Sequence, residues 1–188
     1  MEWRSKPIEG SPWRILPLSE RALLLQREAP GLERVWAADR LLRRERIAGI
    51  VDVVPGYDSV ALSCDPQLLS LEELEAWLMG LDWEIEDIGR APGKLHEIPV
   101  CYELGLDWDI LEKLTGIAPK DYRQRHSERE YRVAMTGFLP GFIYLDGLDP
   151  ELACPRLSTP RTELPEGAVA IGGDQTGIYS FPCPGGWR

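Results

Sequence analysis

Hydrophobic and polar residues along the first half of the chain follow patterns that change from strand to helix and back. Two short apolar runs at 13–18 and 22–26 flank a turn-like tripeptide, so they predict a hairpin. From 32 to 47 apolar residues recur at helical spacing. The predicted buried face of this helix comprises Val35, Ala38, Leu41 and Leu42. Its basic run at 40–46 is interleaved with acidic residues, which favours a solvated face over a binding patch.

A second strand–turn–strand pattern follows this helix. The β-branched runs at 50–54 and 59–64 flank a Pro-Gly-Tyr-Asp segment, which is strong turn chemistry. The Ser-Leu-Glu-Glu capping box at 70–73 predicts a helix that ends near residue 81. Two isoleucines within 85–88 indicate a further short strand.

This order of elements predicts an α+β chain whose first domain is a ferredoxin-like α/β sandwich with an extra N-terminal hairpin strand. We expect that domain to span residues 13–94, preceded by a loose polar tail at 1–12. The Gly-Arg-Ala-Pro-Gly-Lys segment at 89–94 is the best candidate for a linker to a second domain at 95–188.

The second half begins with an alternating apolar pattern that predicts a strand at 95–102. Asp107 is placed to cap a short helix at 108–114, which a glycine ends. A proline sits at the first position of another predicted helix at 119–126. A strand at 130–136 then leads into a stretch with a different composition.

The stretch from Gly137 to Trp187 holds nine of the 18 glycines and seven of the 16 prolines. Because both residue types interrupt helices, this density predicts short strands joined by tight turns. Between Arg132 and Arg188 the chain has only two basic residues, and each follows a proline.

The composition is that of an ordinary globular protein, with 44% hydrophobic and 28% charged residues among 188. The net charge of −10 disfavours a sequence-independent grip on nucleic acid and on anionic membranes. No apolar run has the length of a membrane span, and the N-terminus lacks the apolar core of a signal peptide. We therefore expect a cytoplasmic protein. The four cysteines have no zinc-ligand spacing, so we predict packed thiols and no metal site.

Arg156 and Arg161 are the most specific chemical feature of the chain. Each guanidinium could bind a carboxylate or phosphate with two hydrogen bonds, and the preceding proline would hold the approach extended. The alternative is that they form structural salt bridges. The candidate partners for such bridges are Asp149, Glu151 and Glu163.

A glycine-rich turn at 172–177 follows a predicted buried strand. Its glycines could let the backbone approach a ligand, or they could simply form a bulged hairpin. The residues that we predict to bind substrate or phosphate are Gly172, Gly173, Gln175, Thr176 and Tyr179. Phe138, Phe142 and Tyr144 could wall the same pocket or belong to the core. The turn is not a P-loop, because no lysine is nearby and a strand follows.

His126 stands at the end of a predicted helix, where it could act as a general acid or base, or cap the helix. Asp107 and Asp109 form an acidic pair, which the capping role of Asp107 explains. Serine hydrolase and zinc protease motifs are absent from the sequence. The candidate catalytic residues are His126, Arg156 and Arg161.

Taken together, motifs from about residue 97 onward resemble the family of the 5-oxoprolinase B subunit, also described as allophanate hydrolase subunit 1, which includes the KipI antikinase. The matching pieces are Ile98-Pro99-Val100-Cys101-Tyr102, Asp109, His126, Tyr131-x-Val133, Gly137-Phe138-x-Pro140-Gly141-Phe142-x-Tyr144-Leu145, Pro155-Arg156, Pro160-Arg161, Val169-x-Ile171-Gly172-Gly173, Gln175-Thr176-Gly177-Ile178-Tyr179 and Pro184-Gly185-Gly186-Trp187. Over 13–96 mainly the element order agrees.

The resemblance implies a ferredoxin-like domain followed by a cyclophilin-like β-barrel. It implies one component of an ATP-dependent complex that opens the lactam of 5-oxoproline to give glutamate, together with A-like and C-like partner subunits. ATP, with Mg²⁺, would be used by the complex to activate the stable amide, a step that needs cationic clamps and oriented donors. On this interpretation Arg156 and Arg161 bind the substrate carboxylate or the phosphoryl group. The 172–177 turn would bind an oxyanion or phosphate, with His126 as acid or base.

Two departures from the family pattern stand out. The segment Tyr102–Trp108 lacks the usual Tyr-Gly-Gly turn. The family also continues with further strands beyond Trp187. We therefore expect either an open barrel edge that a partner covers or a truncated chain. In both cases we expect the chain to be inactive without partner subunits. The alternatives are an inhibitor of a sensor histidine kinase, like KipI, or a carboxyltransferase-like domain of a urea or allophanate system.

Overall fold

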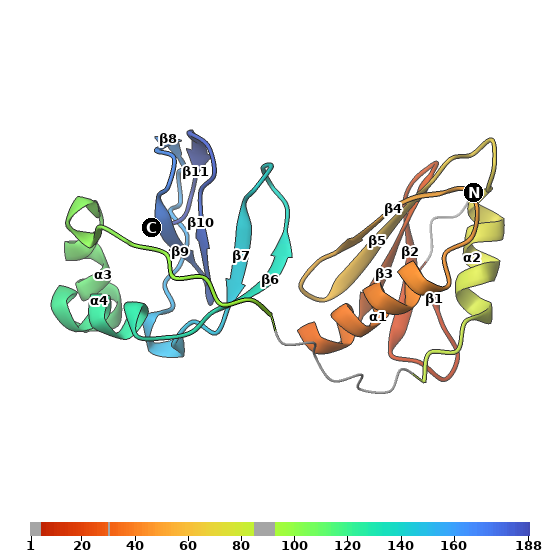
Figure 1. The fold of residues 1–188 in the computed structure, drawn as a ribbon, viewed down its shortest axis with the longest axis horizontal. Helices are drawn as coiled ribbons and strands as arrows, with labels where there is room; N and C mark the ends of the chain where they lie inside the picture. The colour runs from red at the N-terminus through yellow and green to blue at the C-terminus, as the bar shows by residue number, and fades with distance from the viewer. Residues whose placement is uncertain (1–4, 30, 85–92) are drawn as a thin grey trace. The chain divides into compact units, whose positions relative to one another are not determined.

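The computed structural model describes residues 5–29, 31–84 and 93–188, and the chain divides into two compact units, 1–93 and 94–188 (Figure 1). The first unit contains a five-stranded antiparallel sheet in the order β1-β2-β3-β5-β4. Its strands are β1 (Lys6–Pro7), β2 (Trp13–Ser19), β3 (Ala22–Arg27), β4 (Ile50–Pro55) and β5 (Ser59–Cys64). Both hairpins that the sequence predicts are therefore confirmed.

Helices α1 (Leu32–Arg44) and α2 (Leu71–Gly80) pack on the sheet of the first unit. The whole predicted apolar face of α1 is buried. The capping box of α2 is formed as predicted, with both reciprocal Ser70–Glu73 hydrogen bonds. Both helices share one hydrophobic core with alternate residues of the strands, such as Leu23 and Leu62, so they cover the same face of the sheet.

The connection β3-α1-β4 places two parallel strands on either side of β5, because both pair antiparallel with it. The other edge of β3 is occupied by β2. The strand predicted at 85–88 lies outside the described residues.

The described part of the predicted tail is ordered. Strand β1 pairs with β2, and Ile8 is buried in the core of the first unit. The prediction failed here because a lone isoleucine in a polar segment carries no periodic signal, although its burial stabilises the fold.

The second unit contains a four-stranded antiparallel sheet in the order β6-β7-β10-β9 and a two-stranded sheet, β11-β8. The strands are β6 (Arg132–Thr136), β7 (Ile143–Asp146), β8 (Arg161–Leu164), β9 (Val169–Gly172), β10 (Gln175–Ile178) and β11 (Cys183–Gly185). All of these strands are short, as the glycine and proline content predicts.

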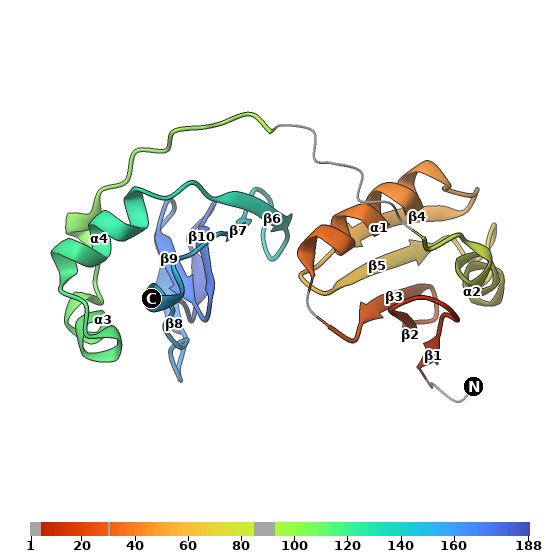
Figure 2. The same ribbon diagram turned by 90° about the horizontal axis from the view of Figure 1, so that it is seen from below.

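Helices α3 (Trp108–Thr115) and α4 (Pro119–Ser127) lie side by side on the β9 side of the four-stranded sheet (Figures 1 and 2). As predicted, Gly116 ends α3 in a left-handed conformation and Pro119 begins α4. Two single 3₁₀ turns, η1 (Tyr102–Leu104) and η2 (Pro150–Leu152), complete the unit. Its buried residues form two clusters, one under the helices around Leu152 and one around Phe142.

The strand predicted at 95–102 is wrong. Residues 93–101 form an irregular segment that leads to η1 and α3 (Figure 2), and 93–99 are exposed. An alternating pattern selects a strand only where a partner pairs with its backbone, and pairing is a non-local property.

Among the helices in the described ranges, none combines the length and hydropathy of a transmembrane segment.

Candidate functional site

A cavity of about 380 Å³ lies within the second unit, at the side of β9 that faces α3 and α4. Its walls come from residues 98–108, from the two helices and from 164–171, and most of its surface is apolar. The charged, histidine and tyrosine side chains in the lining are few: Tyr102, Asp107, Tyr122, His126, Arg161, Glu166 and Arg188. A small apolar chamber with a few polar groups has the form of a binding site for a small molecule.

Arg161 and Asp107 form an ion pair at the wall of this cavity. Arg161 Nη2 donates to both carboxylate oxygens of Asp107, at 2.6 and 2.8 Å. Its Nη1 donates to the carbonyl of Trp187 at 3.2 Å. The Asp107 side chain is 8% exposed and that of Arg161 is 24% exposed, so the pair is shielded from solvent. A short, charge-assisted contact of this kind fixes the direction of the guanidinium.

Two sequence predictions are corrected by this pair. Asp107 precedes α3 as predicted, but its side chain makes no capping hydrogen bond. The carboxylate is instead occupied by Arg161, a partner 54 residues away. The salt-bridge partners suggested for Arg161 are wrong for the same reason.

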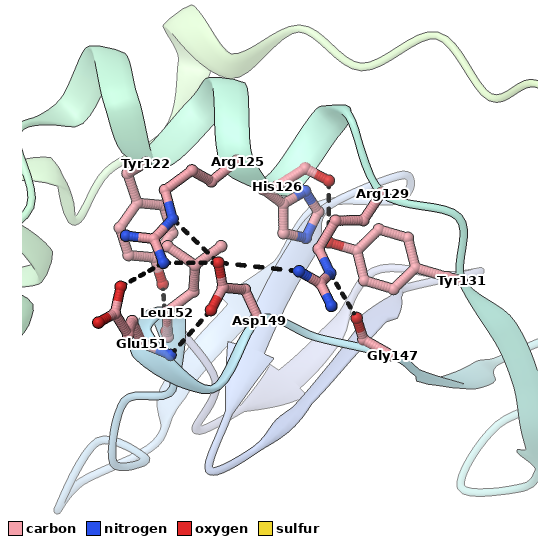
Figure 3. Close-up of polar contacts among 9 residues, drawn as sticks. All are labelled: Tyr122, Arg125, His126, Arg129, Tyr131, Gly147, Asp149, Glu151 and Leu152. Carbon is pink, nitrogen blue, oxygen red and sulfur yellow. Dashed lines mark hydrogen bonds and ion pairs between the residues drawn. The ribbon is translucent and has the colours of Figure 1, made fainter.

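Arg156 lies apart from the cavity. Its guanidinium stacks on the ring of Trp187, with 5.4 Å to the ring centroid, and the residue is exposed. Asp149 and Glu151, two of the suggested partners, bind Arg125 instead (Figure 3). Both arginines contact Trp187, but only Arg161 lines the cavity.

His126 lines the cavity from α4 and is 7% exposed. Its Nδ1 lies 2.6 Å from the hydroxyl oxygen of Tyr102, and its Nε2 lies 3.2 Å from the hydroxyl oxygen of Thr176. Burial lowers the pKa of His126 to about 4, so the ring is neutral at neutral pH. Neither nitrogen bonds a helix carbonyl, and the suggested capping role is therefore wrong.

Tyrosine hydroxyls fix the helix that carries His126. Tyr131 donates to the backbone carbonyl of His126 at 2.8 Å, and Tyr122 donates to that of Leu152 at 2.6 Å (Figure 3). Burial raises the pKa of Tyr131 to about 12 and raises that of Tyr122 as well. Both groups therefore remain protonated donors at neutral pH.

The glycine-rich turn is a tight hairpin between β9 and β10, in which Gly172 pairs with Gln175. Gly173 takes the left-handed conformation that the turn requires, with φ of 72°. Gly172 is needed for another reason: a methyl group there would lie 2.5 Å from Trp187 Cδ1. The close approach that the glycines permit is thus to Trp187. Gly172, Gly173 and Gln175 do not line the cavity.

The aromatic residues divide as follows. Phe142 and Tyr179 are buried in one cluster, against which Tyr144 packs. Phe138 is 60% exposed, with a left-handed backbone, and its ring meets that of Phe142 edge-on. None of the four lines the cavity.

Of the residues predicted from sequence, His126 and Arg161 both line the cavity. Thr176 does not line it, but its hydroxyl lies within hydrogen-bond distance of His126 Nε2. Sequence reasoning missed Tyr102 and Asp107 as parts of this site. Tyr102 belongs to the Ile-Pro-Val-Cys-Tyr motif, so a signal was present, but its apolar alternation pointed to a strand. The pairing of Asp107 had no local signal.

Donors for a metal or a nucleotide are scarce here. Within the ranges described, no cluster of three or more His, Cys, Asp or Glu residues could hold a metal ion. The cavity wall offers neither carboxylates grouped for Mg²⁺ nor a phosphate-cradling loop. These residues do not fit Mg²⁺-ATP.

The carboxyltransferase domain family, subdomain C and D, has a family model that matches residues 13–188. The chain therefore belongs to this family. Its fold is accordingly a mixed α/β fold of the carboxyltransferase type, with antiparallel sheets.

Curated relatives share much of the chain. The B subunit of 5-oxoprolinase from Haemophilus influenzae is 39% identical in an alignment of 186 residues. The alignment covers 93% of this chain and 83% of that protein. The proteins of the same name from Escherichia coli O157:H7 and Bacillus subtilis are 34% and 33% identical, and the matches cover 80% and 69% of their lengths.

The chain is also similar to solved structures. The protein TTHA0988 has a TM-score of 0.72 and 37% identity, and the match covers 89% of this chain and 34% of that one. The urea amidolyase of Kluyveromyces lactis has a TM-score of 0.73 at 17% identity, over 98% of this chain and 13% of that one. The latter likeness concerns the fold alone.

Proposed function

We propose that the chain is the B-type subunit of an ATP-dependent 5-oxoprolinase, a complex that opens the lactam of 5-oxoproline to give glutamate. The observation that carries this proposal is the 39% identity to the B subunit of a 5-oxoprolinase over 93% of the chain. The cavity wall lies within 98–188, and the match to the family model, over 13–188, includes all of it.

The cavity suits a small anionic lactam. Its apolar walls would pack against the methylene groups of the ring, and Arg161 would bind the carboxylate. A guanidinium has five N–H donors, and the contacts to Asp107 and Trp187 use three, which leaves two for a ligand. Asp107 would hold the guanidinium in place while the substrate binds.

The chemistry would be divided among several chains. The B-type subunit would hold and orient the lactam, while A-like and C-like subunits would bring Mg²⁺-ATP, since the donors for it are scarce in the described residues. We further propose a ferredoxin-like domain at 13–94 and a cyclophilin-like barrel at 95–188, in a cytoplasmic complex.

The test is reconstitution with A-like and C-like subunits, followed by measurement of 5-oxoproline-dependent phosphate release and glutamate formation. Arg161→Lys keeps the charge beside Asp107 but loses the planar fork, so KM for 5-oxoproline should rise about tenfold or more. Arg156→Lys is the matched control, because Arg156 does not line the cavity, and its KM should stay within about twofold.

Other outcomes point elsewhere. Equal KM values for both variants would remove Arg161 from the site while leaving the activity in place. Turnover that requires urea and a biotin-carrying partner would replace the proposal with a carboxyltransferase role, the function class of the family's name. A complex that is inert with every mixture of subunits, yet inhibits a sensor histidine kinase, would replace it with a KipI-like role.

A further inference from the structure

A chain of hydrogen bonds runs from the cavity wall into the second unit. It begins at the hydroxyl of Tyr102, which lies 2.6 Å from His126 Nδ1. It continues from His126 Nε2 to the hydroxyl of Thr176 at 3.2 Å. It ends where Thr176 Oγ1 donates to the backbone carbonyl of Ala170 at 3.0 Å. Tyr102 and His126 line the cavity, whereas Thr176 is fully buried.

The direction of every bond in this chain follows from its buried end. A threonine hydroxyl has one hydrogen, and a carbonyl can only accept, so that hydrogen lies between Thr176 and Ala170. Thr176 Oγ1 must then accept from His126, which places the ring hydrogen on Nε2. A neutral imidazole carries a single N–H, so Nδ1 accepts the hydroxyl hydrogen of Tyr102.

The ring is neutral because it is buried. His126 is 7% exposed, and no ion pair to it is formed within the ranges described. The charged residues beside it in the sequence are Arg125, which binds Asp149 and Glu151, and Glu128, the C-cap residue of α4. Burial lowers the pKa of His126 and raises that of Tyr102. At neutral pH the imidazole is therefore neutral and the phenol keeps its hydrogen.

Tyr102 is therefore committed as a donor to His126. Its only hydrogen is used, and the lone pairs of its oxygen remain for the cavity. A tyrosine of this kind acts as a hydrogen-bond acceptor alone. Arg161, on the same cavity wall, is a donor alone.

A ligand that matches both groups needs an acceptor for Arg161 and a hydrogen-bond donor for Tyr102. We propose that Tyr102 is a specificity-determining residue that accepts a hydrogen bond from the ring N–H of a lactam acid, and that His126 is the positioning residue that makes it an acceptor. This inference rests on the proposed function, because it names the part of the substrate that Tyr102 recognises. It also reassigns His126, since both of its ring nitrogens are engaged and neither is free to exchange a proton with substrate.

The pair of ligands that tests this proposal differs at one atom. The γ-lactone that corresponds to 5-oxoproline has a ring oxygen where the lactam has N–H. In the lactone, the lone pairs of the ring oxygen would face the lone pairs of the Tyr102 hydroxyl oxygen, and the two would repel each other. The reconstituted complex should therefore bind 5-oxoproline at least about tenfold more tightly than the lactone, as measured by the dissociation constants from calorimetry.

The variant Tyr102→Phe removes the acceptor and keeps the ring. We expect it to weaken 5-oxoproline binding about tenfold and to change lactone binding less than about twofold. Leu106→Ala, at an exposed apolar residue of the same wall, is the control, and it should affect both ligands alike. Equal losses for both ligands in Tyr102→Phe would overturn the specificity role. A wild-type complex that neither binds nor opens 5-oxoproline would instead overturn the proposed function.

The positioning role of His126 has a test that needs neither substrate nor partners. The chain has two histidines, so His96→Gln leaves His126 as the only source of imidazole ¹⁵N signals. We expect the neutral tautomer with hydrogen on Nε2 and a hydrogen-bonded Nδ1, and we expect Tyr102→Phe to shift the Nδ1 signal while Nε2 stays unchanged. A ring with hydrogen on Nδ1, or a charged ring at pH 7, would overturn this role.

Discussion

Asp107, which is buried, and Arg161, whose side chain is 24% exposed, form the ion pair of the candidate site. Removing one partner of such a pair leaves the other charge without compensation, which typically costs about 3–5 kcal/mol. We therefore expect Arg161→Ala to lower the free energy of unfolding by about 3 kcal/mol, measured by urea denaturation. Because Arg161→Ala would also lower activity by loss of folded protein, Arg161→Lys is the better probe of function.

The more exposed pair between Arg125 and Asp149 is the control for this prediction. Its side chains are 33% and 14% exposed, against 24% and 8% for Arg161 and Asp107, and ion pairs that are more open to solvent contribute less to stability. Arg125→Ala should therefore cost clearly less than Arg161→Ala. Comparable losses in the two variants would contradict the view that shielding from solvent decides the difference.

His126 makes stability depend on pH in a defined window. Its pKa in the folded chain is about 4, below the ordinary 6.5, so the unfolded chain binds more protons between these pH values. The free energy of unfolding should therefore fall by about 3 kcal/mol as the pH drops from 6.5 to 4. Urea denaturation at a series of pH values measures this slope.

Two variants isolate the contribution of His126. His126→Gln should flatten the slope between pH 6.5 and 4, while His96→Gln, at an exposed histidine, should keep it. Carboxylates with a lowered pKa, such as Asp149, lose their contribution at lower pH and do so equally in both variants. Identical slopes in the two variants would show that the ring of His126 is not buried in its neutral form.

Sequence could indicate which residue types matter at this site but not how they pair. An arginine isolated in a segment poor in charge, and a histidine at a helix end, are visible as single residues. The pairing of Arg161 with Asp107 spans 54 residues, and that of His126 with Thr176 spans 50. Contacts at such separations depend on how the strands and helices are arranged, which no local pattern encodes.

At the scale of elements, the hairpin of β9 and β10 is held against Trp187. A methyl group at Gly172 would lie 2.5 Å from Trp187 Cδ1, so Gly172→Ala forces either the indole or the strand to move. Overpacking of this kind costs about 1–3 kcal/mol, which urea denaturation would detect. At Gly137 a methyl group meets no atom within 4 Å, so Gly137→Ala should change stability by less than about 0.5 kcal/mol. A stable Gly172→Ala variant would mean that Trp187 is not packed on the hairpin.

The elements that sequence predicted well are those with local determinants. Helix α2 has its capping box and α4 has its first-turn proline, and both begin where these residues place them. The strand at 95–102 failed because alternation alone cannot provide a pairing partner. Its apolar residues serve another purpose, since Ile98 and Val100 line the cavity.

At the scale of the whole molecule, each unit has a hydrophobic core of its own. One cluster gathers the buried residues of the first unit, and two clusters gather those of the second. The order of hydrophobic patterns was enough to anticipate an α+β chain whose first half contains two hairpins. It could not anticipate that a cavity would stay open beside β9, because a cavity is defined by what the surrounding elements leave unfilled.

Two leucines with the same burial test whether these cores are energetically independent. Leu62 in the first unit and Leu152 in the second are both fully buried. Truncation of either to alanine should cost about 2–5 kcal/mol, because each leaves a cavity in a packed core. No buried cluster in the described residues contains side chains from both units. Leu62→Ala should therefore lower amide protection only within residues 5–84, and Leu152→Ala only within residues 93–188. Hydrogen exchange resolved by peptide measures this directly, and loss of protection in both units from one substitution would show that they unfold as a single cooperative body.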